Sequence, residues 1–106
     1  MRSLVIVPDA NMDFPTWLAV QSDTINALSL AAGVAESSTV PAGAGKVFFA
    51  STGNYYVKVN GTATVPGDTT DGSASELNPM GYKVNPGDVI SIIASAACIV
   101  TLAYYR

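Results

Sequence analysis

Three carboxylates lie close together in one long polar stretch, and they are the side chains best suited to chemistry. Asp68, Asp71 and Glu76 all fall within residues 66–80. Two opposed carboxylates can hydrolyse a glycosidic bond, and Asp68 and Asp71 with Ser73 offer oxygen ligands for Ca²⁺, although the spacing does not match an EF-hand. Nothing in a solvated loop would raise the pKa of one carboxyl. The stretch is therefore interpreted as a solvated acidic loop, whose length favours a functional contact.

Histidine-dependent sites are excluded because the chain contains no histidine. This removes the Ser-His-Asp triad, the Cys-His pair and the usual imidazole metal sites. The single cysteine, Cys98, lies in an apolar run and is interpreted as a small buried hydrophobe. The glycines match neither phosphate-binding pattern. We predict no catalytic, cofactor-binding or metal-ligating residue, and a protein that is not an enzyme.

Charge is scarce in this chain of 106 residues, whose length fits one domain. Charged residues make up 12%, against about 25% in a typical domain, so the surface is expected to contain contact sites. The net charge of −3 and the lack of a basic run argue against a nucleic-acid partner. The apolar start is too short for a signal peptide, and no stretch approaches the ~20 apolar residues of a membrane span. We expect a protein made in the cytoplasm, with no export signal and no membrane partner.

Short strands separated by Gly/Pro turns dominate from about residue 39 onward. Runs rich in β-branched and aromatic residues predict strands at residues 46–51, 55–59, 81–84, 89–94 and 98–105. Asn60-Gly61, between the strand at 55–59 and the run at 62–65, predicts a tight hairpin because both turn residues accept a positive φ. Residues 82–90 resemble the Pro-Gly-Asp turn of cupin barrels, without the histidines that bind metal in cupins.

The first 38 residues leave alternatives open. Residues 16–32 contain enough Ala and Leu for a helix, and the segment could also be an arm that orders against a partner. We expect extended structure, with strands at 3–7, 14–20 and 24–30. Seven to nine short strands predict an all-β fold: a single compact antiparallel β-sandwich over residues 1–106, jelly-roll-like, with 1–38 as a candidate extended arm.

The last strand, residues 98–105, is apolar on both faces. A strand with one wet face should alternate, so this strand is either central and covered on both sides or meets another subunit with its outer face. The small size of the domain favours the second alternative. The adjacent pairs Tyr55-Tyr56 and Tyr104-Tyr105 each point one ring inward and one outward. Interface packing, core packing and a sugar-stacking platform are the alternatives for these rings, in that order of preference.

Several segments carry a resemblance that covers roughly residues 38–106. They are 39–43, 53–58, 61–66, 71–79 and 95–106. In these segments the chain resembles small β-rich virion proteins of tailed bacteriophages. The resemblance implies a capsid decoration (cement) protein on the virion surface, bound as a homotrimer to the major capsid protein of the outer shell. Such a protein stabilises the assembled lattice by binding that state alone.

Two groups of contact residues follow from this interpretation. The predicted oligomer interface centres on the last strand and comprises Tyr104, Tyr105, Ile99 and Tyr56. The predicted capsid contact lies in the N-terminal stretch and the acidic loop and comprises Trp17, Phe14, Asp71 and Glu76.

Two other functions stay open. A receptor- or glycan-binding tip of a phage fibre would also be all-β and trimeric, but a tip normally follows a long shaft, whereas this chain begins with a strand. A carbohydrate-active enzyme fragment would need two carboxylates facing one another in a cleft.

Overall fold

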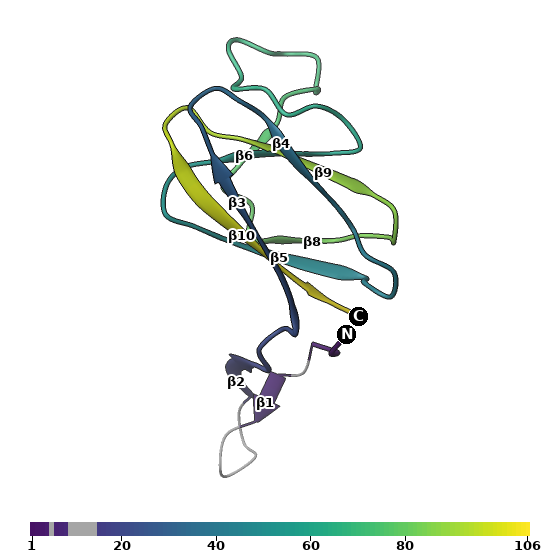
Figure 1. The fold of residues 1–106 in the computed structure, drawn as a ribbon. Helices are drawn as coiled ribbons and strands as arrows, with labels where there is room; N and C mark the ends of the chain where they lie inside the picture. Colours follow the sequence, from purple (N-terminus) through teal and green to yellow (C-terminus); the bar gives the residue numbers. More distant parts are fainter. Residues whose placement is uncertain (5, 9–14) are drawn as a thin grey trace.

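The computed structural model describes the backbone of residues 1–4, 6–8 and 15–106, and the side chains of residues 1–4 and 20–106. Strands, turns and loops account for all of these residues (Figure 1). The described part of the chain has no helix, and so none that could cross a membrane.

Eight strands form two four-stranded antiparallel sheets, which confirms the predicted all-β sandwich. The first, called the β3 sheet, contains in spatial order β3 (Thr24–Leu30), β10 (Cys98–Tyr105), β5 (Lys46–Ser51) and β8 (Gly81–Lys83). The second, called the β4 sheet, contains β4 (Glu36–Thr39), β9 (Val89–Ile93), β6 (Tyr56–Val59) and β7 (Glu76–Leu77).

The strand order is that of a jelly roll. Strands from the two halves of the chain pair as a nested hairpin: β3 with β10, β4 with β9, β5 with β8, and β6 with β7. Rolling this hairpin up adds the pairs β10–β5 and β9–β6. Eight strands in two such sheets form the double Greek key of jelly rolls. The jelly-roll expectation therefore agrees with the observed topology.

The N-terminal strands lie apart from the sandwich. β1 (Ile6–Pro8) and β2 (Pro15–Ala19) pair antiparallel in a separate two-stranded sheet, below the sandwich in the view of Figure 1. β3 and β4, by contrast, are integral to the sandwich, and Leu30 is buried in its core. Residues 1–38 were the candidate arm, and only the part of this segment that precedes β3 lies outside the two main sheets. The expected extended structure is confirmed for β2 and β3.

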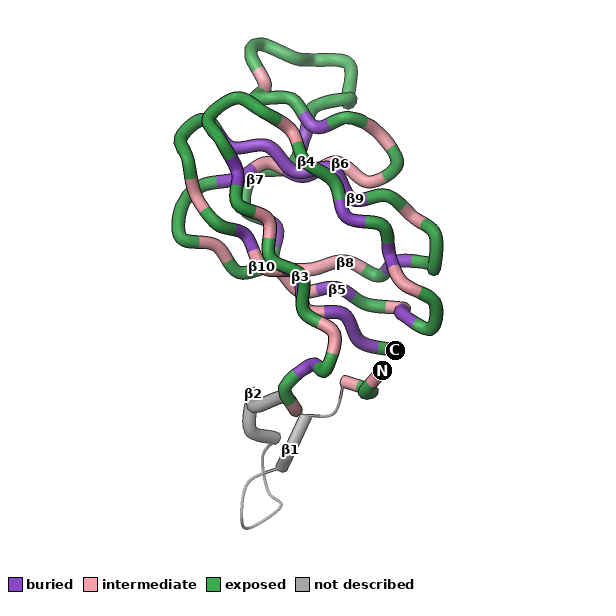
Figure 2. The backbone as a smooth tube through the Cα atoms, viewed as in Figure 1, coloured by how far each residue is buried: buried purple, intermediate pink, exposed green. Residues whose placement is uncertain are grey.

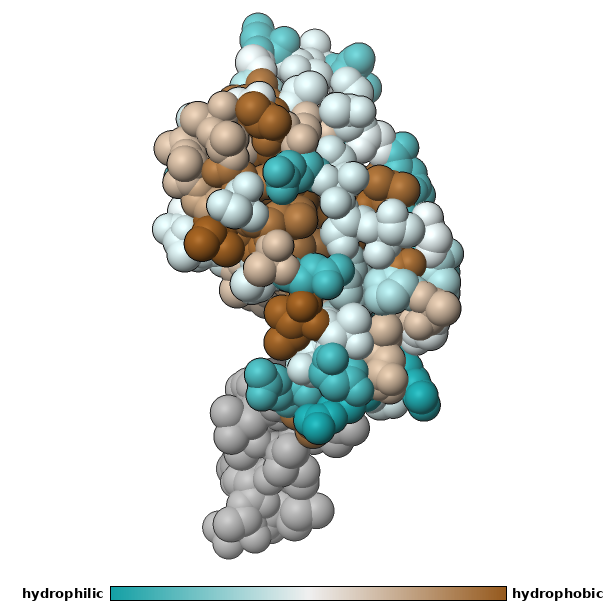
Figure 3. Space-filling model, viewed as in Figure 1, coloured by the Kyte–Doolittle hydropathy of each residue, from teal (hydrophilic) through white to brown (hydrophobic). Residues whose placement is uncertain are grey.

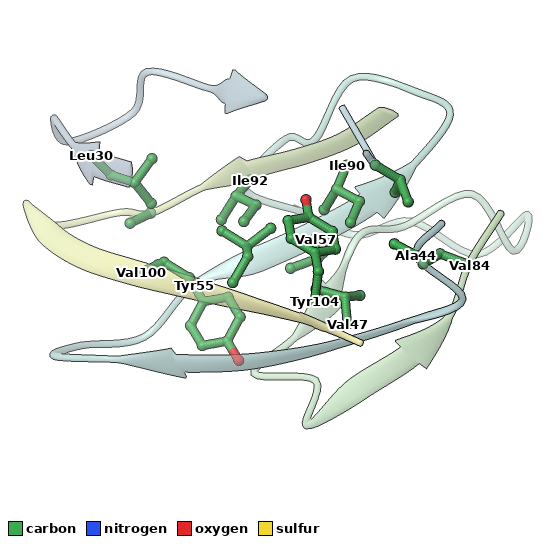
Figure 4. Close-up of a cluster of buried hydrophobic side chains, with 13 residues drawn as sticks. Leu30, Ala44, Val47, Tyr55, Val57, Val84, Ile90, Ile92, Val100 and Tyr104 are labelled. Carbon is green, nitrogen blue, oxygen red and sulfur yellow. The ribbon is translucent and has the colours of Figure 1, made fainter. Parts of the chain in front are cut away.

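Alternation of side chains builds the core between the sheets. Along β10, Val100, Leu102 and Tyr104 are fully buried, while the residues between them are more exposed (Figures 2 and 4). Ile90 and Ile92 of β9 meet them from the β4 sheet. Complete burial of one such aliphatic side chain stabilises a fold by about 1.5–3 kcal/mol. The core therefore fixes which face of each strand points outward.

Tyrosine hydroxyls close both open sides of the sandwich. On the side of β3 and β4, the Tyr104 hydroxyl and Ser38 Oγ lie 2.7 Å apart and form a buried hydrogen bond. On the side of β8 and β7, the Tyr82 hydroxyl donates to Glu76 Oε1. Each bond joins one sheet to the other, so the two layers are held in a fixed relation.

The predicted hairpin after β6 is wrong. Asn60 does adopt a positive φ of 57°, as a tight turn requires, but residues 62–65 form no strand. Both edges of β6 are already paired, with β9 and β7. The chain crosses the outer face of the β4 sheet instead, and the Ala63 amide donates to Ser91 Oγ at 2.9 Å.

Candidate functional site

The outer surface of the β3 sheet is largely apolar over three adjacent strands, and the charged residue of these strands, Lys46, lies at the end of β5. In β10 it presents Ile99, Thr101 and Ala103, the residues that alternate with the core positions. The register places residues of β3 and β5 on either side of them. This surface is called the uncharged face, and it comprises Ile25, Ala27, Ser29, Phe48, Ala50, Ile99, Thr101 and Ala103.

The uncharged face is open to solvent in the protomer. Ile25 is 46% exposed and Ile99 is 47% exposed. A shallow depression of about 220 Å³ lies between Ala50, Ile99 and neighbouring residues. Figure 3 shows hydrophobic residues over the part of the sandwich that contains β3 and β10, with hydrophilic residues gathered near the termini. Contiguous exposed apolar area of this kind usually marks a binding surface.

A groove adjoins the uncharged face along β5 and β8. Its volume is about 450 Å³, and its lining includes Phe48, Met80 and Tyr82. Met80 is 83% exposed, the highest value among the large hydrophobic residues whose side chains the structure describes. Gly81 also lines the groove, and a Cβ there would lie 2.6 Å from the Val47 carbonyl oxygen and 2.9 Å from the Phe48 ring. The groove extends the apolar surface to the edge of the sheet.

Basic residues gather at one end of the sandwich, beside this groove. Lys46 lies opposite Lys83 in the β5–β8 register, and its ammonium donates to the Arg106 carbonyl oxygen. The Arg106 amide in turn donates to the Arg2 carbonyl oxygen at 3.1 Å. Four of the five basic residues of an acidic chain therefore border this end. Asp23, which accepts from the Arg2 amide at 3.2 Å, lies at the same end, so the uncharged face has a rim that is mainly cationic.

Two of the three carboxylates of the acidic loop, those of Asp71 and Glu76, accept separate hydrogen bonds. Asp71 Oδ1 accepts hydrogen bonds from the Ser73 hydroxyl at 2.6 Å and the Ser73 amide at 3.1 Å, which lowers the pKa of Asp71. A general acid needs the opposite shift. Glu76 Oε1 accepts a hydrogen bond from the Tyr82 hydroxyl. Among the described residues, no group of three or more Cys, Asp or Glu side chains is placed to hold a metal ion.

The four predicted interface residues do not form one surface. Tyr104 is fully buried in the core, and Tyr105 is 6% exposed. The Tyr105 ring packs edge-to-face against Phe48, and its hydroxyl donates a hydrogen bond to the Val20 carbonyl oxygen. Neither side chain is accessible to a second copy, so the interface predicted through them is corrected. Ile99 lies on the uncharged face, while Tyr56 lies on the outer face of the β4 sheet.

The predicted capsid contacts also divide. Asp71 and Glu76 are exposed and lie on the loop and on β7. Phe14 falls outside the described residues, and Trp17 lies in β2, where the side chains are not described. The sequence interpretation missed Ile25, Ala27, Phe48 and Ala50, because only the strand register brings them beside Ile99.

Half-buried Cys98 packs against the core cluster at the start of β10. Its Cβ would lie 3.2 Å from a Cβ at Gly53. The expectation of a small buried hydrophobe is met only in part, because Cys98 packs against the core but stays partly exposed.

Comparison with protein families, curated proteins and solved structures finds no match to this chain. The uncharged face, its groove and its cationic rim are therefore interpreted from their own chemistry.

Proposed function

We propose that the protein is a non-enzymatic structural component of a bacteriophage particle, a capsid decoration protein that binds the major capsid protein on the outer shell. The observation that carries the proposal is the uncharged face, on which Ile25 and Ile99 are about half exposed. Interface cores are depleted of charged residues and are surrounded by a polar rim. The uncharged face and its rim of Lys46 and Lys83 have this composition.

The fold supports the same class of function. Jelly rolls of eight strands occur in viral capsid proteins and in lectins, so the architecture is compatible with the role but does not assign it by itself. The carboxylates of the acidic loop support the non-enzymatic part of the proposal. Asp71 has a lowered pKa, and Glu76 is hydrogen-bonded to a tyrosine of the other sheet.

The mechanism is stabilisation by selective binding. A protein that binds only the assembled lattice stabilises it by about 2.7 kcal/mol per site when its free concentration is a hundred times the Kd. Many such sites act together on one shell, so weak individual contacts are sufficient. The resemblance implies that copies bind as a homotrimer, and the shell contact proposed here does not depend on the number of copies.

Co-sedimentation with tailless capsids of the encoding phage tests the proposal. The substitution Ile99→Lys places a charge within the uncharged face and should weaken capsid binding at least tenfold. Leu77→Lys is the matched control, because Leu77 is 51% exposed but lies on the other sheet. The control should bind like the wild type.

Three results would contradict this assignment. Wild-type protein that stays in the supernatant at saturating concentration would rule out the decoration role. Equal binding by Ile99→Lys and wild type would exclude the uncharged face as the contact. Binding to host glycans in place of capsids would favour the fibre-tip alternative.

A further inference from the structure

The four free edges of the two sheets differ in length and in protection. β8 has three residues and ends in Lys83, β7 has two residues and begins with Glu76, and β4 has four residues and begins with Glu36. Short length and charged side chains are the usual means of preventing strand addition at an edge. These three edges are therefore protected.

The fourth edge, β3, has none of these protections. Its seven residues, Thr-Ile-Asn-Ala-Leu-Ser-Leu, contain no charge and no proline. It pairs with β10 in continuous register without a bulge, and among the described residues no other strand pairs with it. A long, uncharged edge without a bulge is a template for another strand.

The hydrogen-bonding pattern shows which backbone groups of β3 are free. The Ile99 amide donates to Thr52 Oγ1, and the Ile99 carbonyl accepts from the Thr52 amide. Thr52 follows β5, so the N–H and C=O groups of Ile99 point toward β5 and away from β3. Backbone groups alternate in direction along an antiparallel strand, and paired residues exchange both bonds. Val100, Leu102 and Tyr104 therefore bond to β3. The residues that point their N–H and C=O groups outward are Ile25, Ala27 and Ser29.

We propose that β3 pairs antiparallel with β3 of a second copy about a two-fold axis at Ala27. In this register Ala27 lies opposite Ala27, and Ile25 lies opposite Ser29. All three outward N–H groups of each copy then donate to outward carbonyls of the other copy, which gives about six hydrogen bonds in total. The two β3 sheets become one continuous sheet of eight strands, and the two uncharged faces become one surface.

A second copy fits this edge better than an unrelated strand for two reasons. The register that centres on Ala27 is the one that uses every outward group of both strands, and it places small or uncharged side chains opposite each other throughout. The pairing also occupies the one long edge of each copy, so the assembly closes at two instead of growing into a fibre. This two-fold pair replaces the homotrimer that the resemblance implies.

The inference does not rest on the decoration role, because it concerns only how two copies join. An edge contact of this size is smaller than a standard interface, so we expect a concentration-dependent dimer with a Kd on the order of micromolar. Light scattering coupled to size-exclusion chromatography, over a range of loading concentrations, should give a mass that rises to twice the 10.9 kDa of the chain.

Charge exchange at Ala27 tests the axis directly. Ala27→Lys places two lysines opposite each other at the two-fold axis and should weaken the dimer about fivefold or more, and Ala27→Glu should do the same. An equimolar mixture of the two variants should recover the dimer as a heterodimer. Leu77→Lys, on the other sheet, is the control and should dimerise like the wild type.

Proline at the same position tests the backbone bonds. The Ala27 amide points away from β10, and proline is tolerated on edge strands in that orientation. Ala27→Pro should keep the circular dichroism spectrum of the fold and weaken dimerisation about thirtyfold, since it removes two of the inter-chain bonds. A wild-type mass of one or three chains at every concentration would overturn the proposal. So would a mixture of the Lys and Glu variants that stays monomeric.

Discussion

Removing the hydroxyl of Ser38 should destabilise the fold more than removing the hydroxyl of Tyr104, although the two share one hydrogen bond. Tyr104 is fully buried in the β3 sheet, and its hydroxyl lies 2.7 Å from Ser38 Oγ in the β4 sheet. Ser38 Oγ also accepts a hydrogen bond from Asn26 Nδ2 at 3.2 Å. The two partners are therefore unequal, because among the described residues Ser38 has a second partner for its hydroxyl and Tyr104 does not.

The expected free energies follow from this asymmetry. Ser38→Ala leaves the buried phenol hydroxyl without a partner, which costs about 1–3 kcal/mol of unfolding free energy. Tyr104→Phe leaves Ser38 with Asn26 and costs about 0.5–1.5 kcal/mol. The double variant removes both polar groups, so its loss should fall about 1 kcal/mol below the sum of the single losses.

Urea unfolding followed by far-ultraviolet circular dichroism measures all three variants. Single losses that add within about 0.5 kcal/mol in the double variant would show that the two hydroxyls are not coupled, and the closure of this side of the sandwich by Tyr104 would be refuted. Tyr104→Phe should leave the assembly state unchanged, because Tyr104 has no exposed surface. A change in mass would restore Tyr104 as an interface residue.

Two further substitutions test local features of the sandwich. Gly81→Ala should lower the free energy of unfolding by about 1–3 kcal/mol in urea, because the new Cβ would lie 2.6 Å from the Val47 carbonyl oxygen. The control Gly67→Ala should be neutral, because a Cβ there would have nothing within 4 Å. Equal losses of stability in the two variants would contradict this packing. The amide of Asn85 donates to Asp88 and lowers its pKa. A lowered folded-state pKa gives stability that is present above the ordinary carboxyl pKa and lost as pH falls through the folded value. Asp88→Asn should therefore lower stability at pH 7 and flatten the acid side of the pH profile, and an unchanged profile would contradict it.

Strands with a strong local pattern could be predicted from the sequence. The predictions at 46–51 and 98–105 match β5 and β10 residue for residue, since β-branched and aromatic runs with Gly/Pro boundaries need no distant information. Of the two alternatives for the last strand, coverage of both faces within the domain is wrong, and contact of the outer face with another subunit stays a prediction. β10 is central within its sheet, one face packs in the core, and the other face carries half-exposed Ile99.

The failed hairpin shows where local rules stop. Asn60 turns the chain as predicted, but the next residues can pair with β6 only if its edge is free. In the jelly roll, that edge of β6 pairs with β7, a strand that follows the long loop in the sequence. The pairing partner of a strand depends on the topology of the whole chain, so it cannot be predicted from the two residues of a turn.

The shortage of charge has a definite location in the structure, and this location connects the composition to the proposed contacts. β3, β10 and β5 together contain one charged residue, Lys46, which lies at the end of β5. A core requires apolar residues on the inner face of each strand only, since an exposed outer face can be polar. The absence of charge from the β3 edge and from the outer face beyond Lys46 is therefore not explained by folding. Burial against another protein surface would explain both. The capsid shell would cover the outer face, and a second copy of the chain would cover the β3 edge.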